Sequence, residues 1–80
     1  MNEDLKFIIS LLGRSPNCRL NKNKVGYLAD RNGFNIEKAK SDPLFEKINI
    51  HRQRKPGGYY YEYWYVSSHR RREIQWLLKK

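Results

Sequence analysis

Apolar positions in the first part of the chain repeat with the spacing of an α-helix. Near the N-terminus, four of them fall on one helical face: Leu5, Ile8, Ile9 and Leu12. Residues three and four positions apart share a face of a helix, so this stripe would turn toward a core. Asn2 can cap the helix and Gly13 can end it. The pattern predicts an amphipathic helix from about Glu3 to Leu12.

A second helix is predicted after the polar stretch from Arg14 to Leu20. It begins near Asn21 or Asn23 and ends at about Arg31. Its inner stripe has three members: Val25, Leu28 and Ala29.

A third helix is predicted beyond the turn signal Asn32-Gly33. Asn35 is suited to cap it, and the helix runs from Ile36 to about Asp42. Pro43 limits its extent, because proline lacks the N–H that a helix needs. Leu44 and Phe45 then lead into a strand as core residues.

The pattern next changes from helical spacing to strand-like runs. Two such runs, Glu46 to Gln53 and Tyr59 to Val66, flank the turn Lys55-Pro56-Gly57-Gly58. Five tyrosines and a tryptophan occupy six of the seven positions from 59 to 65. The pattern predicts a β-hairpin over about residues 46–66.

The register of this hairpin decides which rings face the core. A loop with an even number of residues would place Ile48 and Ile50 on the face of the odd-numbered tyrosines: Tyr59, Tyr61, Tyr63 and Tyr65. An odd loop would place the isoleucines with Tyr60, Trp64 and Val66 instead, and Tyr61, Tyr63 and Tyr65 would point away from the core. The sequence leaves both registers open. We favour the odd loop, because it buries Trp64 and Val66.

The last residues return to helical spacing. Ile74, Leu77 and Leu78 lie on one side, with Trp76 next to them. We expect a helix over about residues 68–80. Its apolar side would pack on the core or pair with the same helix of a second copy.

The predicted elements follow in the order helix, helix, turn, helix, strand, hairpin, strand and helix. This order resembles that of a winged helix. The segment from Leu28 to Ala39 resembles the helix-turn-helix signature, which has a small residue, a glycine, an apolar residue and a capping residue in order: Ala29, Gly33, Phe34 and Asn35. The resemblance implies an α+β fold, a winged helix-turn-helix. It would have a three-helix core, a β-hairpin wing over 46–66 and a C-terminal helix over 68–80, in a single domain, 1–80.

The resemblance also implies that the third helix lies in the major groove of DNA. Lys38 and Lys40 would then bond to phosphates or guanine edges, and Ser41 would reach a phosphate. The helix carries no arginine, the side chain that makes the commonest base-specific contact. Base-specific contacts are therefore not expected to dominate.

Charge supports a polyanionic partner. The net charge is +9, and residues 51–80 hold 8 basic and only 2 acidic side chains, against 9 and 6 in residues 1–50. The basic excess thus lies on the hairpin and the tail, where it would attract DNA, RNA or an anionic surface. The candidate basic contacts are Arg52, Arg54 and Lys55 near the hairpin tip, and Arg70, Arg71 and Arg72 at the start of the tail helix.

Catalysis and metal binding find little support in the sequence. The single cysteine, Cys18, cannot complete a zinc set with His51 and His69, and the chain has no glycine-rich phosphate loop. A single cysteine cannot form an internal disulfide, and this favours a reducing compartment. No apolar stretch is long enough to span a bilayer, so we expect a cytoplasmic protein. We also expect no metal and no cofactor.

The sequence predicts a non-enzymatic nucleic-acid-binding protein, with DNA favoured over RNA. It would act as a transcriptional regulator or a replication accessory, with a homodimer formed through the C-terminal helix as one option. An alternative is a binder of single-stranded DNA or RNA that stacks bases on Tyr61 and Tyr63 of the wing. A second alternative is a protein-interaction module whose basic face meets an acidic partner.

Overall fold

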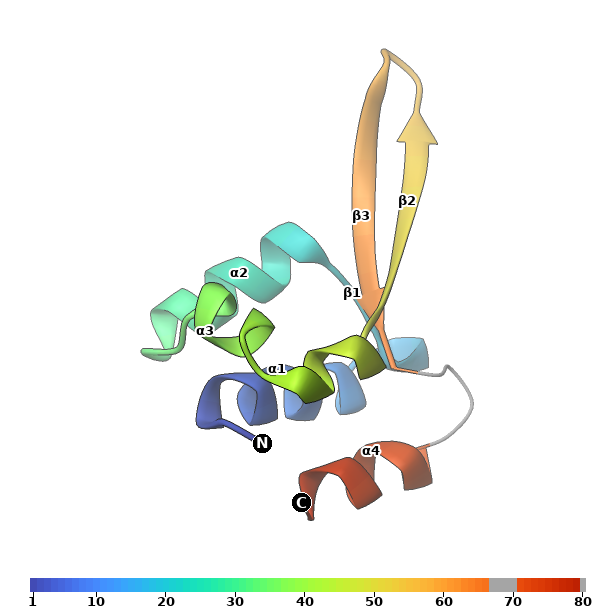
Figure 1. Cartoon of the computed structure of the whole chain (residues 1–80). Coiled ribbons are helices and arrows are strands. Elements are labelled where there is room, and N and C mark those ends of the chain that lie inside the picture. The colour runs from blue at the N-terminus through green and yellow to red at the C-terminus, as the bar shows by residue number, and fades with distance from the viewer. Residues whose placement is uncertain (67–70, 80) are drawn as a thin grey trace.

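Helices form most of the N-terminal half of the chain, and a long antiparallel hairpin follows them (Figure 1). The computed structural model describes residues 1–66 and 71–79. It has an α+β fold with four α-helices and one three-stranded antiparallel sheet in these residues. The elements are α1 (Glu3–Gly13), η1 (Pro16–Cys18), β1 (Arg19–Asn21), α2 (Lys22–Arg31), α3 (Ile36–Lys40), η2 (Pro43–Lys47), β2 (Asn49–Lys55), β3 (Tyr59–Tyr65) and α4 (Arg71–Leu78), where η denotes a 3-10 helix.

The first two helices confirm the sequence prediction, because their caps are local. The Asn2 side chain accepts a hydrogen bond from the Leu5 N–H at 2.8 Å and so begins α1. Asn21 does the same for the Asn23 N–H at 2.7 Å at the start of α2. None of the described helices is long and apolar enough to cross a membrane.

The segment before α2 holds a strand that the sequence analysis treated only as a polar stretch. Asn17 and Cys18 adopt left-handed backbone angles, with φ of 56° and 53°, and the chain then enters β1. This strand pairs with β3, which gives the sheet order β1-β3-β2. Three residues are too few to show the alternation that marks a strand, so the pairing depends on β3 and not on the local sequence.

The third helix is shorter than predicted, and the residues after it form no strand. Asp42 lies outside α3 and caps η2, accepting from the Leu44 N–H at 2.9 Å. Leu44 and Phe45 therefore belong to a 3-10 turn, and β2 begins only at Asn49. Asp42 and Pro43 together provide the acceptor and the fixed φ that start a new turn.

The hairpin has the odd register that the sequence analysis favoured. Three residues, Pro56 to Gly58, connect Lys55 to Tyr59, and Ile50 pairs with Trp64. Gly57 and Gly58 have φ of 97° and 85°, a region that suits glycine because it lacks a Cβ. Trp64 and Val66 consequently face the helices.

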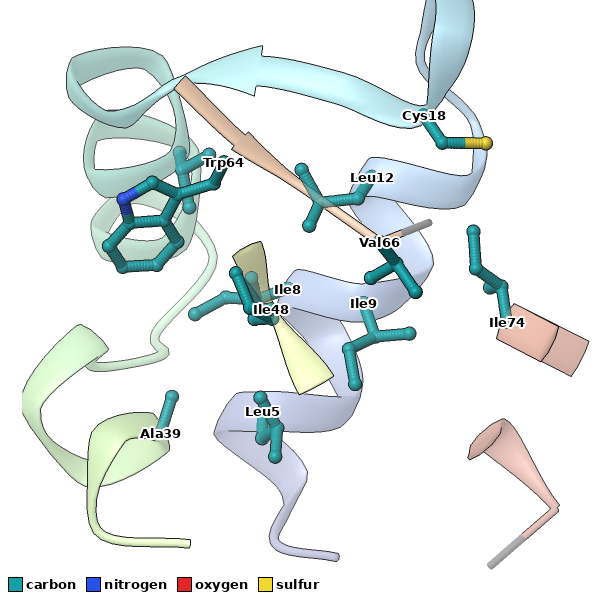
Figure 2. Close-up of a cluster of buried hydrophobic side chains, with 11 residues drawn as sticks. Leu5, Ile8, Ile9, Leu12, Cys18, Ala39, Ile48, Trp64, Val66 and Ile74 are labelled. Atoms are coloured by element: carbon teal, nitrogen blue, oxygen red, sulfur yellow. The ribbon is translucent and has the colours of Figure 1, made fainter. Parts of the chain in front are cut away.

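The core lies between α1, the base of the hairpin and α4 (Figure 2). The four stripe residues of α1 are fully buried and meet Trp64 and Val66 from β3 and the segment that follows it. Ile74 of α4 closes the other side, and a Cβ placed on Gly13 would lie only 3.0 Å from its Cγ2 atom. Of the two arrangements expected for the tail helix, the structure shows packing on the chain's own α1. The described helix runs from Arg71 to Leu78, and the predicted start at residue 68 lies outside the described residues.

Asp42 links the segment that follows α3 to the segment that precedes α1. This link makes the stability of the protein depend on pH. Its carboxylate accepts hydrogen bonds from the backbone N–H groups of Leu44 and Asn2, the latter at 2.6 Å, and these bonds lower its pKa from the ordinary 3.8. The depressed pKa means that this stabilisation is complete above 3.8 and is lost as the pH falls through the lower folded value.

We expect Asp42→Asn to lower the free energy of unfolding by about 1 kcal/mol at neutral pH, because a neutral amide oxygen accepts these hydrogen bonds less strongly than a carboxylate. The loss should shrink in acid, where the wild-type carboxylate is itself protonated. Urea unfolding at neutral and acidic pH measures both values, with Asp30→Asn on the exposed end of α2 as the control. An equal loss at every pH would show that the charge of Asp42 contributes nothing.

Candidate nucleic-acid interface

The β2–β3 hairpin extends away from the helices and has two chemically different faces (Figure 1). We call one of them the core-side face, because its part near the body is buried against the core. The core-side face carries Ile50, Arg52, Arg54, Tyr60, Glu62 and Trp64. The opposite, outer face carries Asn49, His51, Gln53, Lys55, Tyr59, Tyr61, Tyr63 and Tyr65. The strand pairing fixes this division, because side chains alternate along each strand.

Trp64 anchors the core-side face at the base of the hairpin. Its indole is buried and meets the Phe45 ring edge-on, with centroids 5.4 Å apart. Lys40 of α3 places its Nζ 6.0 Å from the same ring, so the end of α3 lies beside the hairpin base. The indole Nε1 has no hydrogen-bond partner among the described residues. Packing, rather than a hydrogen bond of its indole, therefore holds Trp64 at the base of the hairpin.

Farther along the same face, one carboxylate holds two cations. Glu62, whose side chain is only 19% exposed, lies 3.4 Å from Lys22 Nζ at the start of α2 and 3.8 Å from Arg52 Nε on β2. Arg54 is exposed nearer the tip and has no ion pair in the part of the chain that the structure describes. Arg54 is thus fully available to an external phosphate, whereas Arg52 and Lys22 are partly neutralised.

The outer face carries a row of tyrosine rings along β3. Tyr59 and Tyr61 have centroids 5.6 Å apart, and Tyr61 and Tyr63 are 6.3 Å apart. Lys55 holds its Nζ 5.0 Å from the Tyr61 ring centroid, and the Arg19 guanidinium stands 4.2 Å from that of Tyr63. Lys55, Tyr61 and Tyr63, all candidates from the sequence, therefore lie together.

Arg19 is a member of this face that the sequence analysis did not identify. It lies on β1, opposite Tyr65 in the sheet, and so shares a face with the odd-numbered tyrosines. The only local signal was the alternation of Arg19, Leu20 and Asn21, which is too short to predict a strand. Recognising Arg19 required knowledge of the β1–β3 pairing.

The predicted helix-turn-helix segment has a tight local geometry. Gly33 has a φ of 81°, and the Phe34 N–H donates to the Ala29 carbonyl at 2.8 Å. Asn35 caps α3, as predicted, by accepting from the N–H groups of Glu37 and Lys38. The Phe34 ring stacks on Phe7 of α1 with centroids 4.5 Å apart, which fixes the turn to the body.

The candidate residues of α3 are exposed but partly engaged within the chain. Lys40 lies 3.8 Å from Glu37, and the Ser41 hydroxyl donates to the Lys38 carbonyl at 2.6 Å. Lys38 is exposed, and its side chain has no ion pair in the described residues. Lys38 is therefore the most available cation of this five-residue helix.

The arginines of the tail lie apart from the hairpin tip. Arg71 begins α4 and Arg72 is exposed on it, at the end of the molecule opposite to the hairpin tip (Figure 1). Arg70 lies outside the described residues. The structure therefore does not join α4 with Arg52 and Arg54 into one surface.

No metal centre is formed by the histidine, cysteine, aspartate and glutamate side chains of the described residues. Cys18 is buried as a free thiol. Comparison of the chain with family models, with curated proteins and with solved structures gave no match.

Proposed function

We propose that this chain is a non-enzymatic DNA-binding protein of the winged helix-turn-helix kind. In this proposal α2 and α3 form the helix-turn-helix, and the β2–β3 hairpin is the wing. The observation that carries it is the projecting hairpin beside α3, with Arg54 exposed and free near its tip. Such a hairpin can follow a phosphate backbone while α3 approaches a groove.

The geometry between α2 and α3 supports the helix-turn-helix part of the proposal. Ala29 is buried, so α2 approaches its neighbours without a bulky side chain in between. Gly33 takes the left-handed turn, and Asn35 begins α3. A hydrogen bond of 2.8 Å from the Asn35 N–H to Asp4 Oδ1 fastens this cap to α1. The turn is thus held rigidly, which a helix that docks on DNA requires.

Charge and length suggest that phosphate contacts dominate binding. The net charge is +9, and α3 has five residues with two lysines and no arginine. Phosphate neutralisation gives affinity without sequence preference and is strongly dependent on salt. We therefore propose duplex DNA as the main ligand and weak discrimination among sequences. In a homodimer formed through α4, the exposed Trp76 would lie at the contact.

Arg54→Gln tests the wing. We expect the variant to bind a labelled duplex more weakly at every sequence and to reduce the slope of log affinity against log salt by about 1, because one phosphate contact is lost. Fluorescence anisotropy across a salt series measures both quantities. Lys6→Gln, an equal change of charge on an exposed position of α1, is the matched control and should leave the slope unchanged. Equal slopes for Arg54→Gln and wild type would contradict the proposed placement of the wing.

A further inference from the structure

The outer face of the hairpin is extended by two residues of β1, Arg19 and Asn21, and has no acidic residue. With this extension it carries Arg19, Asn21, Asn49, His51, Gln53, Lys55, Tyr59, Tyr61, Tyr63 and Tyr65. On the core-side face, by contrast, Glu62 neutralises part of the charge of Lys22 and Arg52. The two faces therefore offer different environments to an anion, and the outer face contains no carboxylate to repel one.

The cations of the outer face rest on rings instead of on carboxylates. Arg19 stands 4.2 Å from the Tyr63 centroid, and Lys55 stands 5.0 Å from that of Tyr61. A cation on an aromatic ring keeps its full charge while its position is restricted. Arg19 at the base and Lys55 near the tip are thus positioned to contact two phosphates of one chain.

The rings themselves are accessible. Tyr59 is 53% exposed and Tyr61 is 38% exposed, although both lie in a continuous row of rings. Beside them β2 presents Asn49, His51 and Gln53, with no aliphatic side chain. A protein partner would need an apolar patch with a desolvated centre, whereas unpaired bases need flat rings flanked by cations.

We propose that the outer face binds single-stranded nucleic acid, with bases stacking on Tyr59 and Tyr61 and phosphates held by Arg19 and Lys55. This inference rests on the proposed nucleic-acid-binding function and adds unpaired nucleotides to its ligands. The bases of a duplex are already stacked on one another and cannot lie on these rings. The core-side face and α3 remain the surface for duplex, so the hairpin would separate two binding modes.

Tyr60 and Tyr61 provide a matched pair of variants for the test. They are neighbours on β3, but Tyr60 is 62% exposed on the core-side face. With a labelled oligothymidylate of about 12 nucleotides, we expect Tyr61→Ala to weaken binding about tenfold or more. Tyr61→Phe should bind nearly as wild type because it keeps the ring, and Tyr60→Ala should show no loss. Circular dichroism of each variant checks that the sheet is retained.

Salt dependence separates the rings from the cations. Arg19→Gln should reduce the salt slope for the single strand by about 0.7, whereas Tyr61→Ala should change the affinity and leave the slope as it is. Equal losses for Tyr60→Ala and Tyr61→Ala, or no loss for either, would overturn the outer-face site. In that case a duplex affinity that still depends on Arg54 leaves the proposed function in place. Absence of binding to both oligonucleotides at low salt would overturn both proposals.

Discussion

Replacement of Trp64 by alanine should lower the free energy of unfolding by about 3–5 kcal/mol, the largest loss that we expect for a single side chain. The indole is fully buried, lies against Phe45 and joins β3 to the helical core (Figure 2). Its removal leaves a cavity at the point where the hairpin meets the body. A domain of this size is stable by about 5–15 kcal/mol, so the variant would lose a large share of its stability. Urea unfolding followed by circular dichroism measures the loss.

Two further variants separate burial from ring chemistry. Tyr60→Ala removes an exposed ring from the same face of the same strand and should cost no more than about 0.5 kcal/mol. Trp64→Phe keeps an aromatic ring and removes the buried indole N–H, which has no partner among the described residues. Because an unpaired buried N–H is itself unfavourable, we expect this variant to lose much less than Trp64→Ala. If Trp64→Ala and Tyr60→Ala unfold alike, the indole does not anchor the hairpin.

The parts of the fold that could be predicted from the sequence are those whose signals are local. Asn2 and Asn35 cap their helices through their own neighbours, and Gly33 ends a helix because of its own backbone. The burial of Trp64 was favoured but not fixed, because the sequence left both hairpin registers open and only the odd one turns this ring toward the helices. For the caps and the turn, the residue and the contact that explains it are close together in the chain.

The parts that could not be predicted depend on contacts between distant segments. β1 exists because Leu20 lies beside Trp64 in the sheet, more than forty positions away. The end of α3 at Lys40 has a local cause, the cap that Asp42 and Pro43 give to η2, and a distant one, because the Asp42 carboxylate also accepts from the Asn2 N–H, forty positions away in the chain. Periodicity within a short window carries no information about such partners. Strand β1 and turn η2 were therefore missed.

The same distinction applies to the candidate site. Arg52 and Arg54 alternate with Gln53 on β2, so their common face follows from the sequence once the register is known. The difference in their availability does not follow from the sequence, because it arises from Glu62 on the neighbouring strand and Lys22 on α2. Two arginines of the same strand thus differ in availability because one carboxylate pairs with Arg52 and Lys22.

That carboxylate leads to the second large effect that we expect. Glu62→Gln should bind duplex DNA about tenfold more tightly than wild type at moderate salt, and its salt slope should be steeper by about 2. The substitution keeps the shape of the side chain and removes the charge that holds Lys22 and Arg52. Both cations would then be free to neutralise phosphates. Because the Arg52 side chain is exposed, loss of its ion pair with Glu62 should lower the free energy of unfolding by no more than about 1 kcal/mol.

Glu46→Gln is the control that distinguishes release of these two cations from a general change in charge. It is the same substitution on the exposed turn η2 and changes the net charge equally, but Glu46 forms no ion pair with the hairpin cations in the described residues. We expect Glu46→Gln to tighten binding only slightly and to leave the slope nearly unchanged. In the Glu62→Gln background, Arg52→Gln should then remove about half of the added slope, because Lys22 still contributes the rest. If Glu62→Gln and Glu46→Gln have the same slope, Lys22 and Arg52 do not contact DNA, and the duplex would have to follow Arg54 and α3 alone.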